Sequence, residues 1–484
     1  MLSFETLIRA ASVYDGSGKE PEVLDVALRG DRIEAIGSGL NPDGAKVVEG
    51  SGLALAPGFI DVHTHDDLAV IRSPRMEPKI SQGVTTVIVG NCGISAAPVL
   101  LRGELPDPMN LLGSADEFRF RTFAEYKKAV QTASPAVNVA ALIGHTALRN
   151  NHMDRLDRAA SSAEISGMQA QLREALEGGA LGLSTGLAYL SANAATPEEV
   201  LEIAEPLLEA GAVYATHMRT EGEAVLDAMQ EAFMTGRESK VPVIVSHLKC
   251  AGVDNWGRSR EVLDSLEAVR SVQDVGCDCY PYAASSSTLD LRQVDERIEI
   301  TITWSTPHPE VAGMPLAHIA ALWNTSQREA ARQLMPAGAI YHSMHEDDMQ
   351  RILRHPATMI GSDGLPCDPL PHPRLWGTFP RVLGRYCREE KLLPLSQAIH
   401  KMTGMPAGRF GIENRGLIRE SYSADLTLFD PATIIDAATF ADPKRPAAGI
   451  EAVWINGELS YTPRGGSLGR SGRFLTRGKT RWVQ

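Results

Sequence analysis

The chain has 484 residues, of which 43% are hydrophobic and 22% charged, and its formal net charge is −13. Its length favours one large domain with a smaller companion, and its composition is typical of a globular protein. The acidic balance argues against a nucleic-acid partner, and no stretch approaches the ~18 apolar residues of a membrane span.

The N-terminal segment 1–20 lacks the cationic start, the apolar run and the small-residue cleavage site of a signal peptide. Six cysteines are too few for a disulfide scaffold in a chain of this length. A reduced, cytoplasmic protein is therefore the default expectation. In such a protein, a cysteine near histidines is a candidate ligand or nucleophile. The oligomeric state stays open.

Both ends of the chain carry short stretches in which apolar and polar residues alternate. Residues 1–57 show this pattern at 23–28, and residues 412–484 show it at 453–457, each bounded by turn residues. Alternation with a period of two predicts strands and hairpins. Neither end has enough apolar surface for a stable sheet of its own, so we expect both ends to build one small β-sandwich domain.

The middle of the chain, residues 58–411, alternates apolar runs with helical patterns such as 162–177 and 197–210. Apolar runs separated by helices predict an α/β fold with a parallel sheet buried on both faces. There are eight runs, the strand count of a closed (β/α)8 barrel of the TIM type; an open doubly wound sheet is the alternative. The runs are 58–62, 84–89, 137–143, 180–184, 212–216, 241–246, 275–279 and 358–361.

The stretch between the seventh and eighth runs is too long for one helix with two short loops. It is rich in serine, proline and charged residues. We expect residues 283–344 to form an insertion over the mouth of the barrel.

Most of the apolar runs are followed at once by side chains that can do chemistry. In a barrel the carboxyl ends of the strands converge on one mouth, so these groups meet in space although they are scattered in sequence. The segments are 63–65, 91–93, 144–146, 216–219, 246–249, 280–282 and 362–364.

The first of these segments contains His63 and His65, which point to the same face if the strand stays extended. Two neutral imidazoles that face one way can bind one metal ion. Alone, His-x-His is a weak signal, but here cysteine, histidine and aspartate follow at later strand ends. A thiolate with two imidazoles favours zinc over magnesium or calcium.

Residues 59–65, Phe-Ile-Asp-Val-His-Thr-His, resemble the opening signature of the amidohydrolase superfamily. Further motifs are similar to the D-aminoacylase (N-acyl-D-amino-acid deacylase) branch, and the resemblance extends over nearly the whole chain. These motifs lie at 90–95, 216–219, 246–249, 361–366 and 372–377.

The resemblance implies two metal sites, a tight zinc site and a second, weaker one. Many members bridge two metals with a carboxylated lysine at the end of strand four, but here residues 184–186 read Ser-Thr-Gly. A cysteine thiolate from strand two can supply the missing anionic ligand, so we expect one tightly bound zinc. The tight site is assigned to Cys92, His217 and His247, and the weak site to His63, His65 and Asp363.

The activity that the resemblance implies is hydrolysis of the amide bond of an N-acyl-D-amino acid, a small-molecule substrate. Asp363 would take a proton from the attacking water and pass it to the departing amine. Lys249 lies two residues beyond His247 and faces the same way if that strand continues. The candidate substrate-binding residues are Lys249, Tyr280, Ser285, Ser286, Arg374 and Arg292.

The side-chain preference of the enzyme stays open. Arg292 or Arg297 could neutralise an acidic side chain, as in the N-acyl-D-glutamate enzymes that residues 302–305 resemble, and we lean slightly to that substrate. An enzyme for apolar D-side chains is the alternative. A hydrolase of cyclic amides or short peptides, and a binding protein without catalysis, are two further hypotheses. The last would ordinarily lack a ligand or Asp363.

Other polar residues have simpler interpretations. His145 favours a structural, hydrogen-bonded role, and His342 and His345 are expected at the surface. The pair at 178–179, Gly-Gly, is typical of a helix end.

Overall fold

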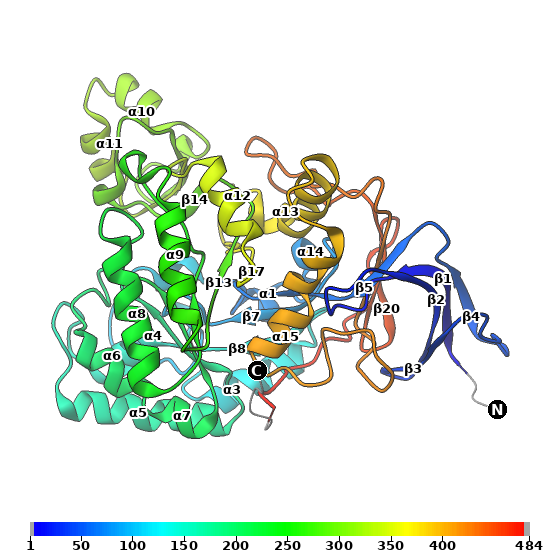
Figure 1. Cartoon of the computed structure of the whole chain (residues 1–484). Coiled ribbons are helices and arrows are strands. Elements are labelled where there is room, and N and C mark those ends of the chain that lie inside the picture. The colour runs from blue at the N-terminus through cyan, green and yellow to red at the C-terminus, as the bar shows by residue number, and fades with distance from the viewer. Residues whose placement is uncertain (1–3, 479–484) are drawn as a thin grey trace.

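The computed structural model describes residues 4–478 and consists of a barrel with a β domain beside it (Figure 1). The barrel interior is filled by apolar side chains such as Ile60, Ile88 and Ile244, and helices cover its outer face. Its strands are β6 (Phe59–Asp61), β7 (Val84–Val89), β8 (Asn138–Ala141) with its continuation β9 (Ile143–Gly144), β10 (Gly182–Gly186), β11 (Val213–His217), β12 (Val243–Val245), β13 (Val275–Cys279) and β17 (Thr358–Ile360).

Two parallel sheets join to close the barrel. One has the order β6-β7-β8 and the other the order β9-β10-β11-β12-β13-β17. Leu142 connects β8 to β9, and a parallel bridge between Thr64 and Gly364 joins the ends of β6 and β17. The closed barrel is therefore confirmed, and the open-sheet alternative is wrong.

The helices follow the sequence pattern closely, with one instructive difference. The helix predicted at 162–177 forms, but the one predicted at 197–210 is divided at Pro206, which has no N–H to donate. The helices around the barrel are α1 (Ala69–Arg72), α2 (Glu77–Ile80), α3 (Phe123–Ala133), α4 (His145–His152), α5 (Ser162–Glu177), α6 (Pro197–Ala204), α7 (Pro206–Ala210), α8 (Val225–Ser239), α9 (Ser259–Arg270), α12 (Glu346–Arg354), α13 (Arg374–Arg381), α14 (Leu395–Met402) and α15 (Gly404–Arg409).

Strands from both chain ends pair in one nine-stranded sheet, which confirms the extra β domain. The junction is β18 against β5, where Leu426 lies opposite Pro57, and Trp454 belongs to the core beneath. The strands are β1 (Thr6–Val13), β2 (Glu22–Arg29), β3 (Arg32–Gly37), β4 (Lys46–Glu49), β5 (Ala54–Pro57), β18 (Leu426–Phe429), β19 (Ile450–Ile455), β20 (Glu458–Thr462) and β21 (Gly466–Ser467).

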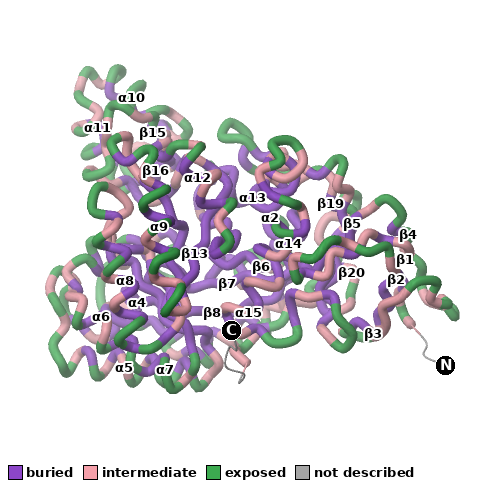
Figure 2. The backbone as a smooth tube through the Cα atoms, in the orientation of Figure 1, coloured by how far each residue is buried: buried purple, intermediate pink, exposed green. Residues whose placement is uncertain are grey.

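Beyond β21 the chain returns to the barrel, where Phe474 packs edge-on against Phe123 and Tyr126 of α3. Not all of 412–478 thus lies in the sheet, and the domain limits at 57/58 and 411/412 stay predictions. Figure 2 shows buried residues concentrated in the barrel strands and exposed residues mainly on the outer loops. Within residues 4–478, no helix is long and apolar enough to cross a bilayer.

Between β13 and β17 the chain forms an antiparallel sheet of its own, in the order β14-β16-β15. Its strands are β14 (Ser285–Thr288), β15 (Ile300–Ser305) and β16 (Ala337–Tyr341), and it carries α10 (Leu316–Leu322) and α11 (Gln327–Leu334). Side chains including Ile302, Leu316 and Leu334 give this segment a separate apolar core. The limits 283–344 stay a prediction.

Candidate active site

Cys92, His217 and His247 meet at the mouth of the barrel. Cys92 follows β7, His217 ends β11, and His247 lies two residues beyond β12. The ligand atoms of the three residues all lie within 4.8 Å of one another. Such a spacing allows three side chains from separate strands to bind one ion.

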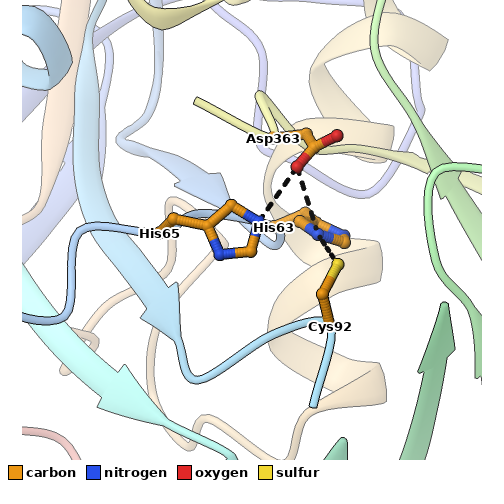
Figure 3. A group of neighbouring side chains, drawn as sticks. All are labelled: His63, His65, Cys92 and Asp363. Carbon is orange, nitrogen blue, oxygen red and sulfur yellow. Dashed lines mark hydrogen bonds and ion pairs between the residues drawn. The ribbon is translucent and has the colours of Figure 1, made fainter. Parts of the chain in front are cut away.

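A second group contains His63, His65 and Asp363, and it shares Cys92 with the first (Figure 3). Cys92 Sγ lies 3.1 Å from His63 Nε2 and 3.4 Å from His247 Nε2. Asp363 Oδ1 lies 3.1 Å from His65 Nε2. The thiol therefore stands between the two groups, where one sulfur can serve both.

Three of these residues have a left-handed backbone. The φ angle is +53° at Cys92, +35° at His247 and +49° at Asp363. Non-glycine residues in such conformations cost on the order of 1–3 kcal/mol each and gather at functional sites. The turn at His247 also corrects an expectation: β12 ends at Val245, so the strand does not continue to Lys249.

The end of strand four explains how Cys92 reaches its position. A Cβ atom at Gly186 would lie 2.1 Å from the carbonyl oxygen of Cys92, which only a glycine avoids. The loop carrying Cys92 is thus packed onto the strand end that lacks a lysine. The missing lysine and the close packing of this loop both favour the Cys92 thiol as the anionic ligand between the two groups.

The charges of the cluster fit a cation. Burial opposes ionisation of the Cys92 thiol, but the His63 and His247 rings lower its pKa well below the ordinary value. Burial also opposes a charged His65 ring, but Asp363 and Cys92 raise the pKa of that ring to about 9. Protons on the imidazoles balance the anions, and a bound divalent cation would displace them, because metal ligands must be deprotonated.

Asp278 of β13 supports both groups, although it lies in no recognisable sequence motif. One of its carboxylate oxygens lies 3.3 Å from His63 Nδ1 and accepts a hydrogen bond of 3.0 Å from the backbone N–H of His247. A carboxylate behind a ligand histidine fixes its tautomer and orientation. A polar residue within an otherwise apolar barrel strand was the available signal.

Lys79 forms a fully buried charge network below the second group. Its Nζ lies 2.8 Å from Asp61, 3.2 Å from Asp66 and 2.7 Å from the hydroxyl of Ser362. Ser362 precedes Asp363, and the two aspartates flank the His-x-His segment, so this lysine ties the ends of β6 and β17 together. A single lysine far away in the sequence carries no local signal for this role.

Lys249 and Tyr280 line a cavity of about 430 Å³ at the barrel mouth. Lys249 Nζ donates to Glu221 at 2.5 Å, so the lysine reaches the site even though its strand has ended. Tyr280 is buried, and its hydroxyl has no hydrogen-bond partner among residues 4–478. Ser285 and Ser286 of β14 lie on the same cavity wall.

Arg374 lies behind the cavity rather than on the part of its wall that the structure describes. The guanidinium is fully buried, lies 3.0 Å from Asp363 Oδ2 and stacks 4.5 Å over the ring of Tyr280. Burial opposes ionisation of Asp363, but Arg374 and His63 hold the pKa of this carboxyl well below its usual value. Asp363 is therefore a carboxylate, as a proton acceptor must be.

The two arginines considered for an acidic side chain are both engaged in ion pairs. Arg292 lines the cavity, where it donates to both carboxylate oxygens of Asp290 and to the carbonyl of Ala188. Arg297 pairs with Asp254 and Asp295 at 2.8 and 2.7 Å and is absent from the described cavity wall.

Three of the remaining histidines lie away from the metal-ligand groups. His145 is buried and contacts Glu199 at 3.2 Å, whereas His342 and His345 are partly exposed on the segment before α12. Gly178 forms the C-terminal cap of α5, as expected.

Comparisons with known proteins place this geometry in a family context. Residues 46–461 match the amidohydrolase family. The chain is 48% identical to the D-aminoacylase of Alcaligenes xylosoxydans xylosoxydans, with 98% of each chain covered. It is 47% identical to the N-acyl-D-aspartate deacylase of the same organism, over 98% of this chain and 95% of the relative.

A solved structure gives the same picture in three dimensions. It is the N-acyl-D-glutamate deacylase from Bordetella bronchiseptica, complexed with zinc and a phosphonate inhibitor that mimics the tetrahedral intermediate of the reaction. Its TM-score to this chain is 0.94 at 43% identity, over 98% of this chain and all of the other.

Proposed function

The chain belongs to the amidohydrolase family, and from this membership we propose that it hydrolyses the amide bond of N-acyl-D-amino acids to a carboxylate and a free D-amino acid. The observation that carries the proposal is Cys92, which stands between two groups of ligands with Asp363 3.1 Å from His65. Folding alone does not require this arrangement. It is energetically unfavourable, because Cys92, His247 and Asp363 all adopt a left-handed backbone.

The donor set fits a zinc ion in the group formed by Cys92, His217 and His247. A thiolate with two imidazoles suits zinc, and three protein ligands leave an open position, as in catalytic sites. The Nδ1 atoms of His217 and His65 are buried and have no hydrogen-bond partner within residues 4–478. We propose one tightly held zinc there and a weaker second site at His63, His65 and Asp363.

Zinc in such a site supplies Lewis acidity and a nucleophile at neutral pH. The protein groups supply the proton transfers: Asp363 accepts the proton of the attacking water at Oδ1 or Oδ2 and donates it to the leaving nitrogen. Arg374 keeps this carboxylate ionised and oriented through the 3.0 Å contact. The proposed proton transfer by Asp363 thus depends on its position and on its contact with Arg374, a pairing that the sequence alone could not identify.

The α-carboxylate of the substrate needs a cationic or hydrogen-bonding wall. Lys249 and Tyr280 are buried and line the cavity, and Ser285 and Ser286 lie on the same wall. Arg374 stays a candidate because its Nε is buried and has no hydrogen-bond partner in the described chain. We propose that Lys249 and Tyr280 contact the carboxylate, assisted by these three residues.

The side chain of the D-amino acid would extend toward the insertion. The hypothesis of an acidic preference depends on Arg292 or Arg297, but Arg292 is matched by the two oxygens of Asp290 and Arg297 by Asp254 and Asp295, which weakens that hypothesis. The relatives act on more than one class: their names include N-acyl-D-aspartate and N-acyl-D-glutamate deacylases as well as a D-aminoacylase. Because Arg292 is already paired with Asp290, a substrate with a neutral side chain fits this wall better than one with an acidic side chain.

The test is a panel of N-acetyl-D-amino acids, their L-forms and a cyclic amide such as a hydantoin, with metal content measured on the same sample. We expect turnover of the D-series, little turnover of the L-series and one zinc retained per chain after exhaustive dialysis. Activity on the hydantoin alone would favour the cyclic-amide alternative. A protein that retains zinc but turns over none of these substrates would favour the binding-protein hypothesis.

A further inference from the structure

Glu221 lies where the metal-ligand cluster meets the substrate-binding wall. We infer that it is a positioning residue, which holds the ligand His247 and the carboxylate-binding Lys249 in register through a single carboxylate oxygen. The inference rests on the proposed function for the role of Lys249, but its part concerning His247 stands on the ligand geometry alone. It assigns a role to a residue that no sequence motif identified.

The geometry is compact and largely shielded from water. Glu221 follows β11, whereas His247 and Lys249 follow β12. Glu221 Oε1 lies 2.8 Å from His247 Nδ1 and 2.5 Å from Lys249 Nζ. The three side chains are 14%, 2% and 7% exposed, respectively. At such burial a charge-assisted hydrogen bond is much stronger than at the surface.

The protonation of His247 follows from its role as a ligand. Its Nε2 faces Cys92 Sγ at 3.4 Å, so a metal ion in this group would use that nitrogen. A neutral imidazole that presents Nε2 to a metal carries its hydrogen on Nδ1. His247 Nδ1 must then donate, and Glu221 Oε1 is the acceptor at hand.

Lys249 makes the carboxylate necessary. Its Nζ lies 2.8 Å from His247 Nδ1, but both atoms are donors when His247 is a ligand. Without an acceptor between them, an ammonium group and an N–H would face each other in a buried site, which is costly. Glu221 Oε1 accepts from both and thereby fixes the distance between the ligand and the lysine.

The Glu221 carboxylate consequently couples substrate binding at Lys249 to the position of the ligand His247. A substrate carboxylate that contacts Lys249 shares this ammonium with Glu221, and any shift of Glu221 is transmitted to the imidazole. The alternative is a salt bridge that only stiffens the loops after β11 and β12. That alternative predicts a loss of thermal stability without any change in zinc release or in substrate affinity.

The experiment compares Glu221→Gln and Glu221→Ala with the matched control Glu223→Gln, an exposed glutamate in the same loop. Zinc-loaded protein is mixed with a chelator, and zinc release is followed; cobalt-substituted protein reports ligand geometry by its visible absorption. We expect the zinc affinity to fall about tenfold in Glu221→Gln and up to about 100-fold in Glu221→Ala. The control should match the wild type.

Zinc release from Glu221→Gln at the wild-type rate, with an unchanged cobalt spectrum, would overturn the inference for His247. If Glu221→Gln does not fold, Glu221→Asp keeps the charge with a shorter reach, and it should fold yet still release zinc faster than the control. These readouts require no substrate. A wild type that turns over no N-acyl-D-amino acid would therefore defeat the proposed function and leave this test intact.

The coupling to Lys249 is tested by a double-mutant cycle on KM for an N-acetyl-D-amino acid. Glu221→Gln should raise KM about tenfold when Lys249 is present and by less than twofold in a Lys249→Met background, because neighbouring residues that act together are not additive. Equal effects in the two backgrounds would show that Glu221 does not act through Lys249.

Discussion

Two buried clusters of histidine and carboxylate lie at the carboxyl ends of the barrel strands, but only one faces the cavity. In the sealed cluster, His145 contacts Glu199 at 3.2 Å, and Arg149 pairs with the same carboxylate while donating to the carbonyls of Ser191 and Leu156. In the open cluster, histidines surround the thiol of Cys92 instead, and a cavity of about 430 Å³ adjoins them.

The pKa values of the histidines also differ between the sealed and the open cluster. Burial lowers the pKa of His145 although Glu199 opposes the shift, whereas Asp363 and Cys92 overcome burial and raise the pKa of His65 to about 9. In the sealed cluster an arginine matches the carboxylate permanently. In the open cluster Arg374 matches Asp363, but the charge of the Cys92 thiolate is matched by protons on the neighbouring imidazoles, which a metal can displace. The histidines of the open cluster are thus ligand candidates because the thiolate that they share, Cys92, has no permanent cation among the groups that shift its pKa.

The largest loss of activity is expected from a substitution of Cys92, because its sulfur belongs to both groups of candidate metal ligands. Cys92→Ala should lose the bound metal and the activity together, because Cys92 belongs to both groups. Metal analysis after dialysis and the rate on an N-acetyl-D-amino acid measure this. Cys387→Ala, which removes a thiol that belongs to neither ligand group, is the control. Full zinc retention in Cys92→Ala would show that the thiol is not a metal ligand, and the contrast between the open and the sealed cluster would then fail.

Asp363→Asn should separate chemistry from metal binding. We expect kcat to fall by about 10²–10⁴-fold, since a proton-transfer group is lost, with the tight zinc retained and the fold intact. Steady-state kinetics with metal analysis and circular dichroism provide the measurement. A variant that keeps the wild-type kcat would exclude the acid–base role, and one that loses the tight zinc would place Asp363 among its ligands.

The sealed cluster should respond in stability rather than in catalysis. Burial opposes ionisation of Glu199, but His145 and a backbone hydrogen bond lower its pKa to about 2. Because the folded pKa lies below the ordinary value of 4.5, this carboxylate stabilises the fold above about pH 4.5, and the contribution is lost as the pH falls toward 2.

Glu199→Gln should therefore lower the free energy of unfolding at pH 7 by about 3 kcal/mol and leave it nearly unchanged near pH 2. Urea unfolding across this pH range is the measurement, with the exposed neighbour Glu198→Gln as control. The zinc content should stay at the wild-type level. Loss of zinc in Glu199→Gln would mean that the two clusters are not independent.

The smallest effect is expected at the outer wall of the cavity. Because Asp290 already engages Arg292, Arg292→Ala should change kcat/KM for N-acetyl-D-glutamate and for N-acetyl-D-leucine by less than about tenfold each. Arg297→Ala is the matched control. A selective loss of one to two decades on the glutamate derivative, the worth of a charge-assisted hydrogen bond of about 1.5–3 kcal/mol, would instead establish the acidic preference.

Much of the barrel, and the set of polar residues that meet at its mouth, was predictable from the sequence. The runs at 84–89 and 275–279 are buried on both faces, and their apolar character is visible residue by residue. That Cys92 and His247 lie close together was predictable because the ends of parallel strands converge in a barrel. The apolar periodicity at 197–210 predicts one helix, but Pro206 has no N–H for the helical hydrogen bond and divides it in two.

The partners of these residues were decided by the tertiary structure alone. Arg374 faces Asp363, and Glu221 joins His247 to Lys249. A sequence determines which charges are present and which strand end carries them, because both follow from local pattern. It does not determine which opposite charge each one meets in a buried site, since that pairing depends on separations of a few ångströms between segments far apart in the chain.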